Sequence, residues 1–269
     1  MVLAHAREIP YLSHDHSNDM KHSLPYPLYD LLFIDVETVS EKAAYDELDE
    51  TTRNLWQEKA RYWMKEYPDE EEGARATYQS RAAILAEFGR VLCISVGYLT
   101  RGETPAEDVL RLKSWCSADE RQVLEPFSAL LETPFGHPQS HMLCGHNIRE
   151  FDVPYLCRRL LMNQMGLPPM LDVAGKRPWE VKHLIDTMEL WKFGDIKHYT
   201  SLKLLSHCLD IPSPKDDISG ADVGRVFYEE QGAERIVDYC EGDVLAVVQV
   251  MRRFCQLPLL AEEQVLKAG

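Results

Sequence analysis

The sequence lacks several features that would assign it to a specialised class of protein. Its longest unbroken apolar run, "VLCISVGYL" at residues 91–99, is far too short to cross a bilayer. The first residues, "MVLAHAREIP", do not combine a basic segment with an apolar stretch, as a secretory signal would. Internal repeats and low-complexity segments are also missing. We therefore expect a globular protein located in the cytoplasm.

Cysteines at metal-binding spacing are missing as well. The chain has 7 cysteines, and no two of them form a Cys-x-x-Cys motif. An odd number of cysteines without such pairs argues against a disulfide framework and against a structural zinc site. We expect the cysteines to be reduced and mostly buried.

Positive charge is scarce, because 29 Lys and Arg stand against 44 Asp and Glu, for a formal net charge of -15. Affinity for long nucleic acid depends on Lys and Arg, so this balance argues against a protein that coats such a polymer. It is compatible with an enzyme that grips a strand end. Residues 41–72 carry eleven acids and five basic residues, whereas residues 176–203 carry six basic residues and four acids.

The order of expected elements indicates a mixed α/β protein with one main sheet. Strands that first adjoin each other and later alternate with helices are typical of this class. Apolar and β-branched runs predict strands near residues 30–37, 90–100, 108–116 and 141–147, and at the start of 183–191. Periodic apolar residues predict helices near residues 119–132, 150–163, 201–210 and 232–256.

Three further segments complete the expected organisation. Residues 42–86 are rich in Ala, Leu, Glu, Lys and Arg and predict a charged helical insertion after the first strand. Residues 1–28 are expected to be an irregular N-terminal segment, and residues 258–269 a C-terminal tail.

The first chemically informative segment is "FIDVET", in which an apolar strand ends in two acids. Strand side chains alternate between faces, so Asp35 and Glu37 share one face while Val36 points to the other. Two like charges on a partly buried face are costly unless a cation lies between them. Three explanations stay open for this pair: a metal ion, a Lys or Arg partner, or a strand end that emerges into water.

The expected last helix contains the segment "YCEGD". Tyr239 and Asp243 lie four residues apart and therefore share a helix face. An acid beside an apolar stripe needs a compensating cation, either a metal ion or an arginine. Asp243 lies close to such a stripe, which consists of Ile236, Cys240, Val244, Val247 and Met251.

The segment "GHNIREFDVPYL" places Asp152 near the start of an expected helix. A carboxylate there can cap free backbone N–H groups, which is the simplest role for it. Asn147 is compatible with a turn residue, and Phe151 with core packing. Each of the three acidic segments is weak evidence for a catalytic site when it is taken alone.

In this order, "FIDVET", "HNIREFDVPYL" and "YCEGD" together resemble the three motifs of the DnaQ-like 3′-to-5′ exonucleases of the DEDD superfamily. Tyr239 four positions before Asp243 matches the tyrosine subclass, whereas the histidine subclass would have His in place of Asp238. The likeness points to the stand-alone family related to the proofreading exonuclease domain of family B DNA polymerases. It covers about residues 30–256.

The resemblance implies a ribonuclease H-like α/β fold with a five-stranded mixed sheet flanked by helices. The exonuclease domain would span residues 29–257 and include the insertion at 42–86. The implied activity is metal-dependent 3′-to-5′ hydrolysis of phosphodiester bonds at single-stranded DNA ends, with release of nucleoside monophosphates by a two-metal mechanism.

The resemblance also implies a set of catalytic and metal-binding residues. Two divalent ions, Mg²⁺ or Mn²⁺, suit a site made of carboxylates without Cys or His. Tyr239 would orient the attacking water, because its reference pKa of about 10 is too high for a base. The metal ligands would be Asp35, Glu37, Asp152 and Asp243.

Two further expectations concern the substrate. Lys215, in "PKDDI", matches a lysine that the family B relatives carry between the second and third motifs. It would stabilise charge at the phosphate, or it is a surface loop lysine that follows two prolines. Base stacking tolerates any sequence, so little base specificity is expected. The positions that match strand contacts of the family are Val36, Thr38, Asn147 and Phe151.

Two other functions stay open. The same acids serve in related enzymes that trim RNA 3′ ends, and the same fold serves in non-catalytic modules that bind nucleic acid or protein. The likeness to proofreading domains favours DNA over RNA, with a polymerase or repair protein on another chain as a candidate partner and no membrane contact. The presence of all four acids and of the tyrosine favours catalysis.

Overall fold

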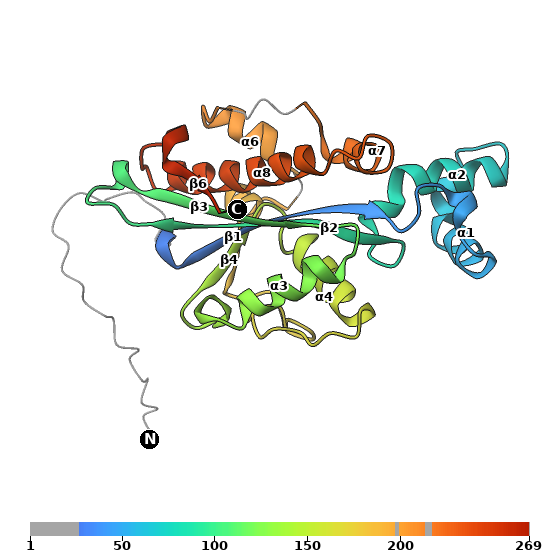
Figure 1. Ribbon diagram of the computed structural model, residues 1–269, viewed down its shortest axis with the longest axis horizontal. Helices are drawn as coiled ribbons and strands as arrows, with labels where there is room; N and C mark the ends of the chain where they lie inside the picture. Colours follow the sequence, from blue (N-terminus) through green and yellow to red (C-terminus); the bar gives the residue numbers. More distant parts are fainter. Residues whose placement is uncertain (1–26, 197–198, 213–216, 269) are drawn as a thin grey trace, which may run out of the picture.

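The computed structural model describes residues 27–196, 199–212 and 217–268, and a mixed sheet lies at its centre (Figure 1). The sheet order is β5-β4-β1-β2-β3-β6, in which β2 is antiparallel to β1 and β3 and the other neighbours are parallel. The strands are β1 Leu31–Ser40, β2 Gly89–Thr100, β3 Val109–Cys116, β4 Met142–Gly145, β5 Leu184–Asp186 and β6 Val265–Lys267.

The predicted α/β class and the mixed sheet are confirmed, with one difference in the number of strands. The five predicted strands are all present, and β6 adds a sixth at the edge formed by β3. This strand comes from residues 258–269, which the sequence predicted to be a tail. Residues 1–26 of the expected irregular segment lie outside the described residues.

Helices cover both faces of the sheet (Figure 1). One face packs against α3 Arg121–Leu131 and α4 Asp152–Met162, and the other packs against α8 Ala233–Phe254. Three shorter helices complete the layers: α5 Thr187–Lys192 after β5, then α6 Leu202–Cys208 and α7 Val223–Tyr228, which both contact α8. None of the helices in the described part of the chain combines the length and apolar character that a membrane crossing requires.

The alternation of side chains along β1 explains why two cores form. Leu32 and Ile34 belong to the core under α3 and α4, whereas Leu31 and Phe33 belong to the core under α8. The odd-numbered side chains of this strand therefore face α8. Asp35 and Glu37, which follow on the same strand, point to that face as well.

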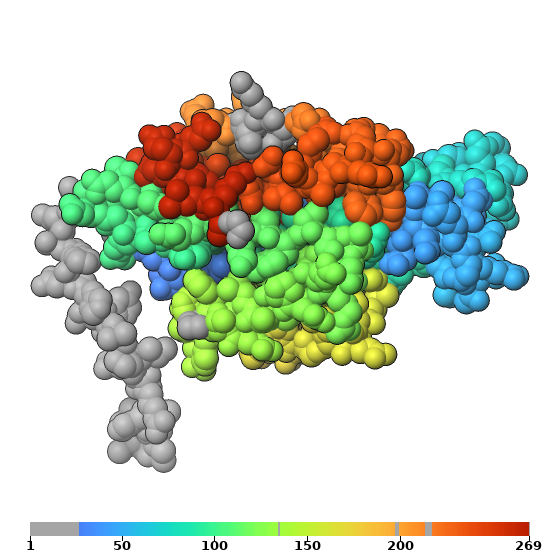
Figure 2. All heavy atoms as spheres, in the orientation of Figure 1, coloured from blue at the N-terminus to red at the C-terminus, as the bar shows by residue number. Residues whose placement is uncertain are grey.

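The segment between β1 and β2 forms a small helical unit with a core of its own. Its helices are α1 Glu50–Met64 and α2 Glu70–Arg81, and they project from one end of the molecule (Figure 2). Asp49 and Asp69 cap their first turns, because each carboxylate accepts a hydrogen bond from a backbone N–H three residues later. Trp56 is fully buried between the two helices and donates its indole N–H to a main-chain oxygen of α2.

Candidate active site

A cavity of about 350 Å³ lies beside α8 and brings together segments that are far apart in the sequence. β1 contributes Asp35 to its lining, and α8 contributes Tyr239 and Asp243. One wall consists of Tyr199 and of Lys203 in α6, and another comes from the loop that precedes α7. The cavity therefore contains two of the three acidic motifs.

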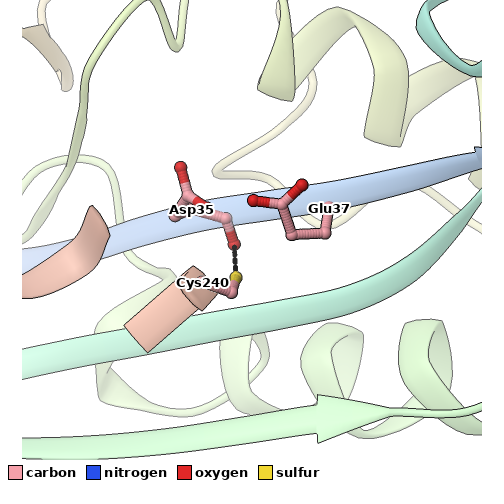
Figure 3. Close-up of side chains that lie close together, drawn as sticks. All are labelled: Asp35, Glu37 and Cys240. Carbon is pink, nitrogen blue, oxygen red and sulfur yellow. Dashed lines mark hydrogen bonds between the residues drawn. The ribbon is translucent and has the colours of Figure 1, made fainter. Parts of the chain in front are cut away.

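Asp35 and Glu37 lie on the α8 face of β1, as the alternation of side chains predicts (Figure 3). The structure adds a cysteine to this pair. One carboxylate oxygen of Asp35, one of Glu37 and the Sγ of Cys240 all lie within 4.8 Å of one another. The Cys240 thiol donates a hydrogen bond to the main-chain oxygen of Asp35, at 3.4 Å. In the sequence this cysteine belongs to the apolar stripe of the expected helix, and its contact with the acids was not predicted.

The electrostatics of this acid pair favour a cation. Burial, followed by the Asp152 carboxylate, raises the pKa of Asp35 to about 8. Burial and the carboxylates of Asp35, Asp243 and Asp152 raise the pKa of Glu37 well above its ordinary value. The Oδ2 atom of Asp35 is buried and has no hydrogen-bond partner among the described residues. The donor set thus fits a divalent ion, which would relieve the repulsion and coordinate the unsatisfied oxygen.

Asp152 reaches the same acids because β1 is longer than its neighbour β4. The pairing of these strands ends at Phe33 opposite Cys144, whereas β1 continues to Ser40. Helix α4 begins at Asp152, which is only 5% exposed and accepts a hydrogen bond from the backbone N–H of Val36. Burial raises the pKa of Asp152 to about 7, and the carboxylates of other acids add to this effect.

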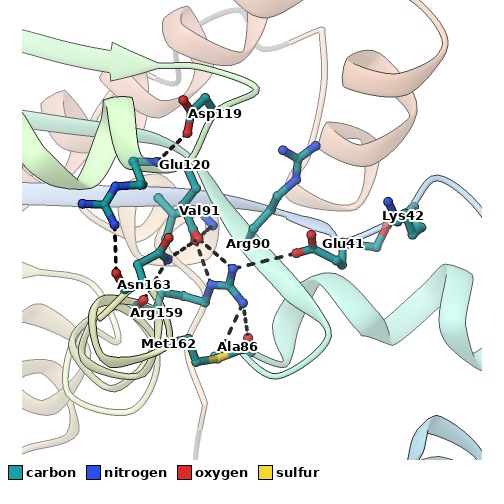
Figure 4. A network of polar contacts seen from close by, with 12 residues as sticks. Glu41, Lys42, Ala86, Arg90, Val91, Asp119, Glu120, Arg159, Met162 and Asn163 are labelled. Atoms are coloured by element: carbon teal, nitrogen blue, oxygen red, sulfur yellow. Dashed lines mark hydrogen bonds and ion pairs between the residues drawn. The ribbon is translucent and has the colours of Figure 1, made fainter. Parts of the chain in front are cut away.

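A buried ion pair connects α4 to the segment before α3 (Figure 4). Arg159, two turns along the helix, donates hydrogen bonds to both oxygens of Glu120, at 2.8 and 2.6 Å. Glu120 precedes α3 and also accepts the backbone N–H of Val91 in β2, at 2.7 Å. Both charged side chains are at least nine-tenths buried. The pair therefore joins α4 to the sheet and to α3.

Tyr239 and Asp243 share one face of α8, as their spacing predicts. The Tyr239 hydroxyl is hydrogen bonded to Asp243. Burial, with the carboxylates of Asp243 and Glu37, raises the pKa of Tyr239 above its ordinary value of 10.0. The phenol therefore keeps its proton at neutral pH and acts as a hydrogen-bond donor.

The loop after β4 is held by an acid that the sequence analysis missed. Asn147 has a left-handed backbone, with a φ of 64°. Asp186 accepts the backbone N–H groups of Asn147 and Arg149, at 3.0 and 3.2 Å, and also that of Met188 in the first turn of α5. An acid at the junction of a strand and a helix is the signal that could have identified it. The Oδ1 atom of Asn147 is buried and unpaired within the described residues.

The expected substrate contacts have different surroundings. Val36 is buried in the core on the face opposite the acids. The Thr38 side chain is also buried and hydrogen bonds to Tyr155. Phe151 is partly buried, with its ring 5.4 Å from that of Tyr155. Lys215 lies outside the described residues.

His146 was not predicted as a site residue, although it directly precedes Asn147 in the "GHN" turn. It lines the cavity, and its Nε2 atom lies 2.8 Å from the main-chain oxygen of Thr200. Its Nδ1 atom lies 2.9 Å from the Thr187 hydroxyl. Burial lowers the pKa of His146, so the ring is neutral, with Nε2–H as the donor to Thr200.

Residues 84–263 match a family model described as "Predicted 3'-5' exonuclease related to the exonuclease domain of PolB". This range includes Asp152, Tyr239 and Asp243 and begins after Asp35 and Glu37. A search of curated proteins found no match.

A solved structure supports the same fold. The family B DNA polymerase from the hyperthermophilic archaeon Pyrobaculum calidifontis matches with a TM-score of 0.51 and 14% identity. The match covers 87% of this chain and 28% of the polymerase chain, so this chain spans little more than a quarter of that protein. At this level of identity the likeness concerns the fold.

Proposed function

Because the chain belongs to the family of predicted 3′-5′ exonucleases related to the exonuclease domain of PolB, we propose that it removes nucleoside monophosphates from single-stranded DNA 3′ ends. The observation that carries this proposal is the convergence of acids from β1, α4 and α8. Asp35, Glu37, Asp152 and Asp243 act on one another electrostatically although up to 208 positions separate them in the chain.

These four acids would hold two divalent ions, Mg²⁺ or Mn²⁺. When bound, such ions make a water molecule nucleophilic near neutral pH and neutralise charge on the leaving oxygen. The buried, unpaired Oδ2 atom of Asp35 supports this assignment. Burial raises the pKa of the Cys240 thiol, so this side chain stays protonated, and carboxylate oxygens remain the donors that suit hard ions.

The other residues have roles that follow from their positions. Tyr239 keeps its proton and donates it to Asp243, so its phenol oxygen would orient the attacking water by accepting a hydrogen bond from it. The Asn147 amide oxygen is buried and unpaired among the described residues, and the proposed contact of Asn147 with the terminal nucleotide rests on the family resemblance. Contacts by Val36, Thr38 and Phe151, and charge stabilisation by Lys215, remain predictions from the family resemblance.

The catalytic domain we propose spans residues 29–257, with residues 42–86 inserted after β1. It contains the four acids and the helices on both faces of the sheet. The preference for DNA over RNA rests on the relation to polymerase proofreading. A polymerase or repair protein on another chain would then supply the strand end.

A 5′-labelled single-stranded oligonucleotide tests this function, as DNA and as RNA, with Mg²⁺ or Mn²⁺. We expect a ladder that shortens from the 3′ end and disappears when EDTA is added. If neither strand shortens with either metal, the protein is not the proposed exonuclease. Shortening of RNA alone would refute the DNA preference.

A pair of variants on α8 tests the assignment of the acids. Asp243→Asn should reduce the rate more than about a hundredfold, since even outer-shell partners of a metal contribute about 10- to 100-fold. Asp238→Asn is the matched control, because Asp238 is exposed and pairs with Lys267 at 2.7 Å. Equal losses in both variants would contradict a site on the Asp243 face.

A further inference from the structure

The connection between α5 and α6 exposes large apolar side chains. Phe193, Ile196 and Tyr199 are 80%, 88% and 70% exposed. Single exposed apolar residues are ordinary, but several of them along one short connection indicate a binding surface. The connection belongs to residues 176–203, the part of the sequence in which basic residues outnumber acids.

This connection continues into the catalytic cavity. Tyr199 and Lys203 line the same cavity as Asp35 and Asp243. A cavity of about 350 Å³ is at the small end of the range for ligand pockets, about 300–1,000 Å³. A terminal nucleotide fills much of such a space, so the preceding nucleotides of a strand must lie along its edge. Tyr199 lines the cavity and is nevertheless largely exposed to solvent. It therefore lies at the edge of the cavity.

The backbone that directly follows Tyr199 is tied to the rest of the fold. The main-chain oxygen of Thr200 accepts a hydrogen bond from His146, which is itself held by Thr187. Ser201 caps α6 by accepting the backbone N–H of Leu204, at 3.2 Å. An exposed ring on an anchored backbone loses little conformational entropy on binding, which favours a rigid stacking contact.

Resting on the proposed exonuclease function, we propose that Tyr199 and Lys203 bind the single-stranded DNA just upstream of its 3′ nucleotide. Tyr199 stacks on a base, and Lys203, which is exposed beside it, pairs with a backbone phosphate. Stacking needs no particular base, and one lysine adds one phosphate contact. This pairing of ring and charge gives an acidic protein a local attraction for a strand end.

Oligonucleotide binding tests the ring. Fluorescence anisotropy with labelled dT8, with Ca²⁺ in place of the catalytic ion, should show about tenfold weaker binding for Tyr199→Leu, in line with the loss of one stacked base. Tyr199→Phe keeps the ring and should bind as the wild type does. Tyr62→Leu is the matched control, because Tyr62 in α1 is 76% exposed and does not line the cavity.

The salt dependence of binding tests the lysine. For Lys203→Ala, the slope of log K against log salt should fall by about 0.7, the value for one phosphate contact to a single strand. Lys65→Ala, in the helical insertion, should leave the slope unchanged. An unchanged slope for Lys203→Ala would overturn the phosphate contact.

A small substrate separates this proposal from the proposed function. The p-nitrophenyl ester of thymidine 5′-phosphate fills only the terminal site, so its hydrolysis by the wild type tests the proposed function without the upstream contacts. The binding assay needs no catalysis. If Tyr199→Leu is the only one of the three tyrosine variants that binds dT8 more weakly, the stacking contact is supported even when the wild type cleaves no ester. Wild-type affinity of Tyr199→Leu for dT8, or equal losses for Tyr199→Phe or Tyr62→Leu, would overturn it.

Discussion

Asp35→Asn should make the metal-free protein more stable and inactive. Asn resembles the protonated form of the carboxyl, so the change removes the cost of ionising Asp35 inside the fold. Folding raises the pKa of Asp35 from 3.8 to about 8, chiefly by burial and next by Asp152. A carboxyl with a raised pKa destabilises the folded state above its unfolded pKa, and the penalty grows as the pH rises toward the folded value.

The size of the effect follows from the two pKa values. At ~1.4 kcal/mol for each pKa unit, the full penalty above pH 8 is about 6 kcal/mol. About 4 kcal/mol of it is present at pH 7 and about 2 kcal/mol at pH 5. The free energy of unfolding of Asp35→Asn should therefore exceed that of the wild type by these amounts. At pH 7 this corresponds to a rise in Tm of about 10 °C.

Urea unfolding in EDTA at pH 5, 7 and 9 measures this difference. Asp108→Asn is a control with the opposite sign, because Asp108 pairs with Arg252 at 2.7 Å and both side chains are fully buried. Leaving Arg252 unpaired should cost about 3–5 kcal/mol. Adding Mn²⁺ should stabilise the wild type, by about 2.7 kcal/mol at 100 times Kd, and should not stabilise Asp35→Asn. A variant no more stable than the wild type at pH 7 and pH 9 would refute the raised pKa of Asp35 in the folded protein.

Three further predictions concern other parts of the site. Tyr239→Phe should lower kcat about 10- to 100-fold, which is the contribution of one hydrogen bond to a charged system. Single-turnover kinetics with saturating Mn²⁺ measure this loss, and a loss near that of Asp243→Asn would instead make the phenol essential. His146→Ala should raise KM for oligonucleotides about fivefold with little change in kcat, because the ring positions the Thr200 backbone and touches no reacting atom. Steady-state kinetics measure both constants, and a fall in kcat alone would contradict this role. Glu120→Gln should lower the free energy of unfolding by about 3–5 kcal/mol, since Arg159 loses its buried partner; a urea midpoint equal to that of the wild type would refute it.

Periodicity was enough to predict most of the fold. Alternation along β1 places Asp35 and Glu37 on one face, and the four-residue spacing places Tyr239 and Asp243 on another, because both patterns depend only on local geometry. Strand β6 and helix α7 escaped prediction. Strand β6, Val265–Lys267, has three residues, and its pairing depends on an edge that β3 offers only in the folded protein.

The contacts between elements could not be predicted in the same way. Cys240 reaches Asp35 because α8 lies very close to the sheet, and Gly97 in β2 permits this approach. A Cβ atom at Gly97 would lie 3.0 Å from Val244. The role of Asp186 was not predicted for a related reason. Its main partners, in the loop after β4, lie about forty residues away in the chain. Such distances carry no periodic signal in a single sequence.

Anomalous diffraction from crystals grown with Mn²⁺ and dTMP tests the central claim most directly. That claim is our proposal that the acids of β1, α4 and α8 hold divalent ions, and it predicts manganese peaks among the carboxylates of Asp35, Glu37, Asp152 and Asp243. Crystals whose manganese peaks lie elsewhere, or which show none beside Asp35, would contradict that claim.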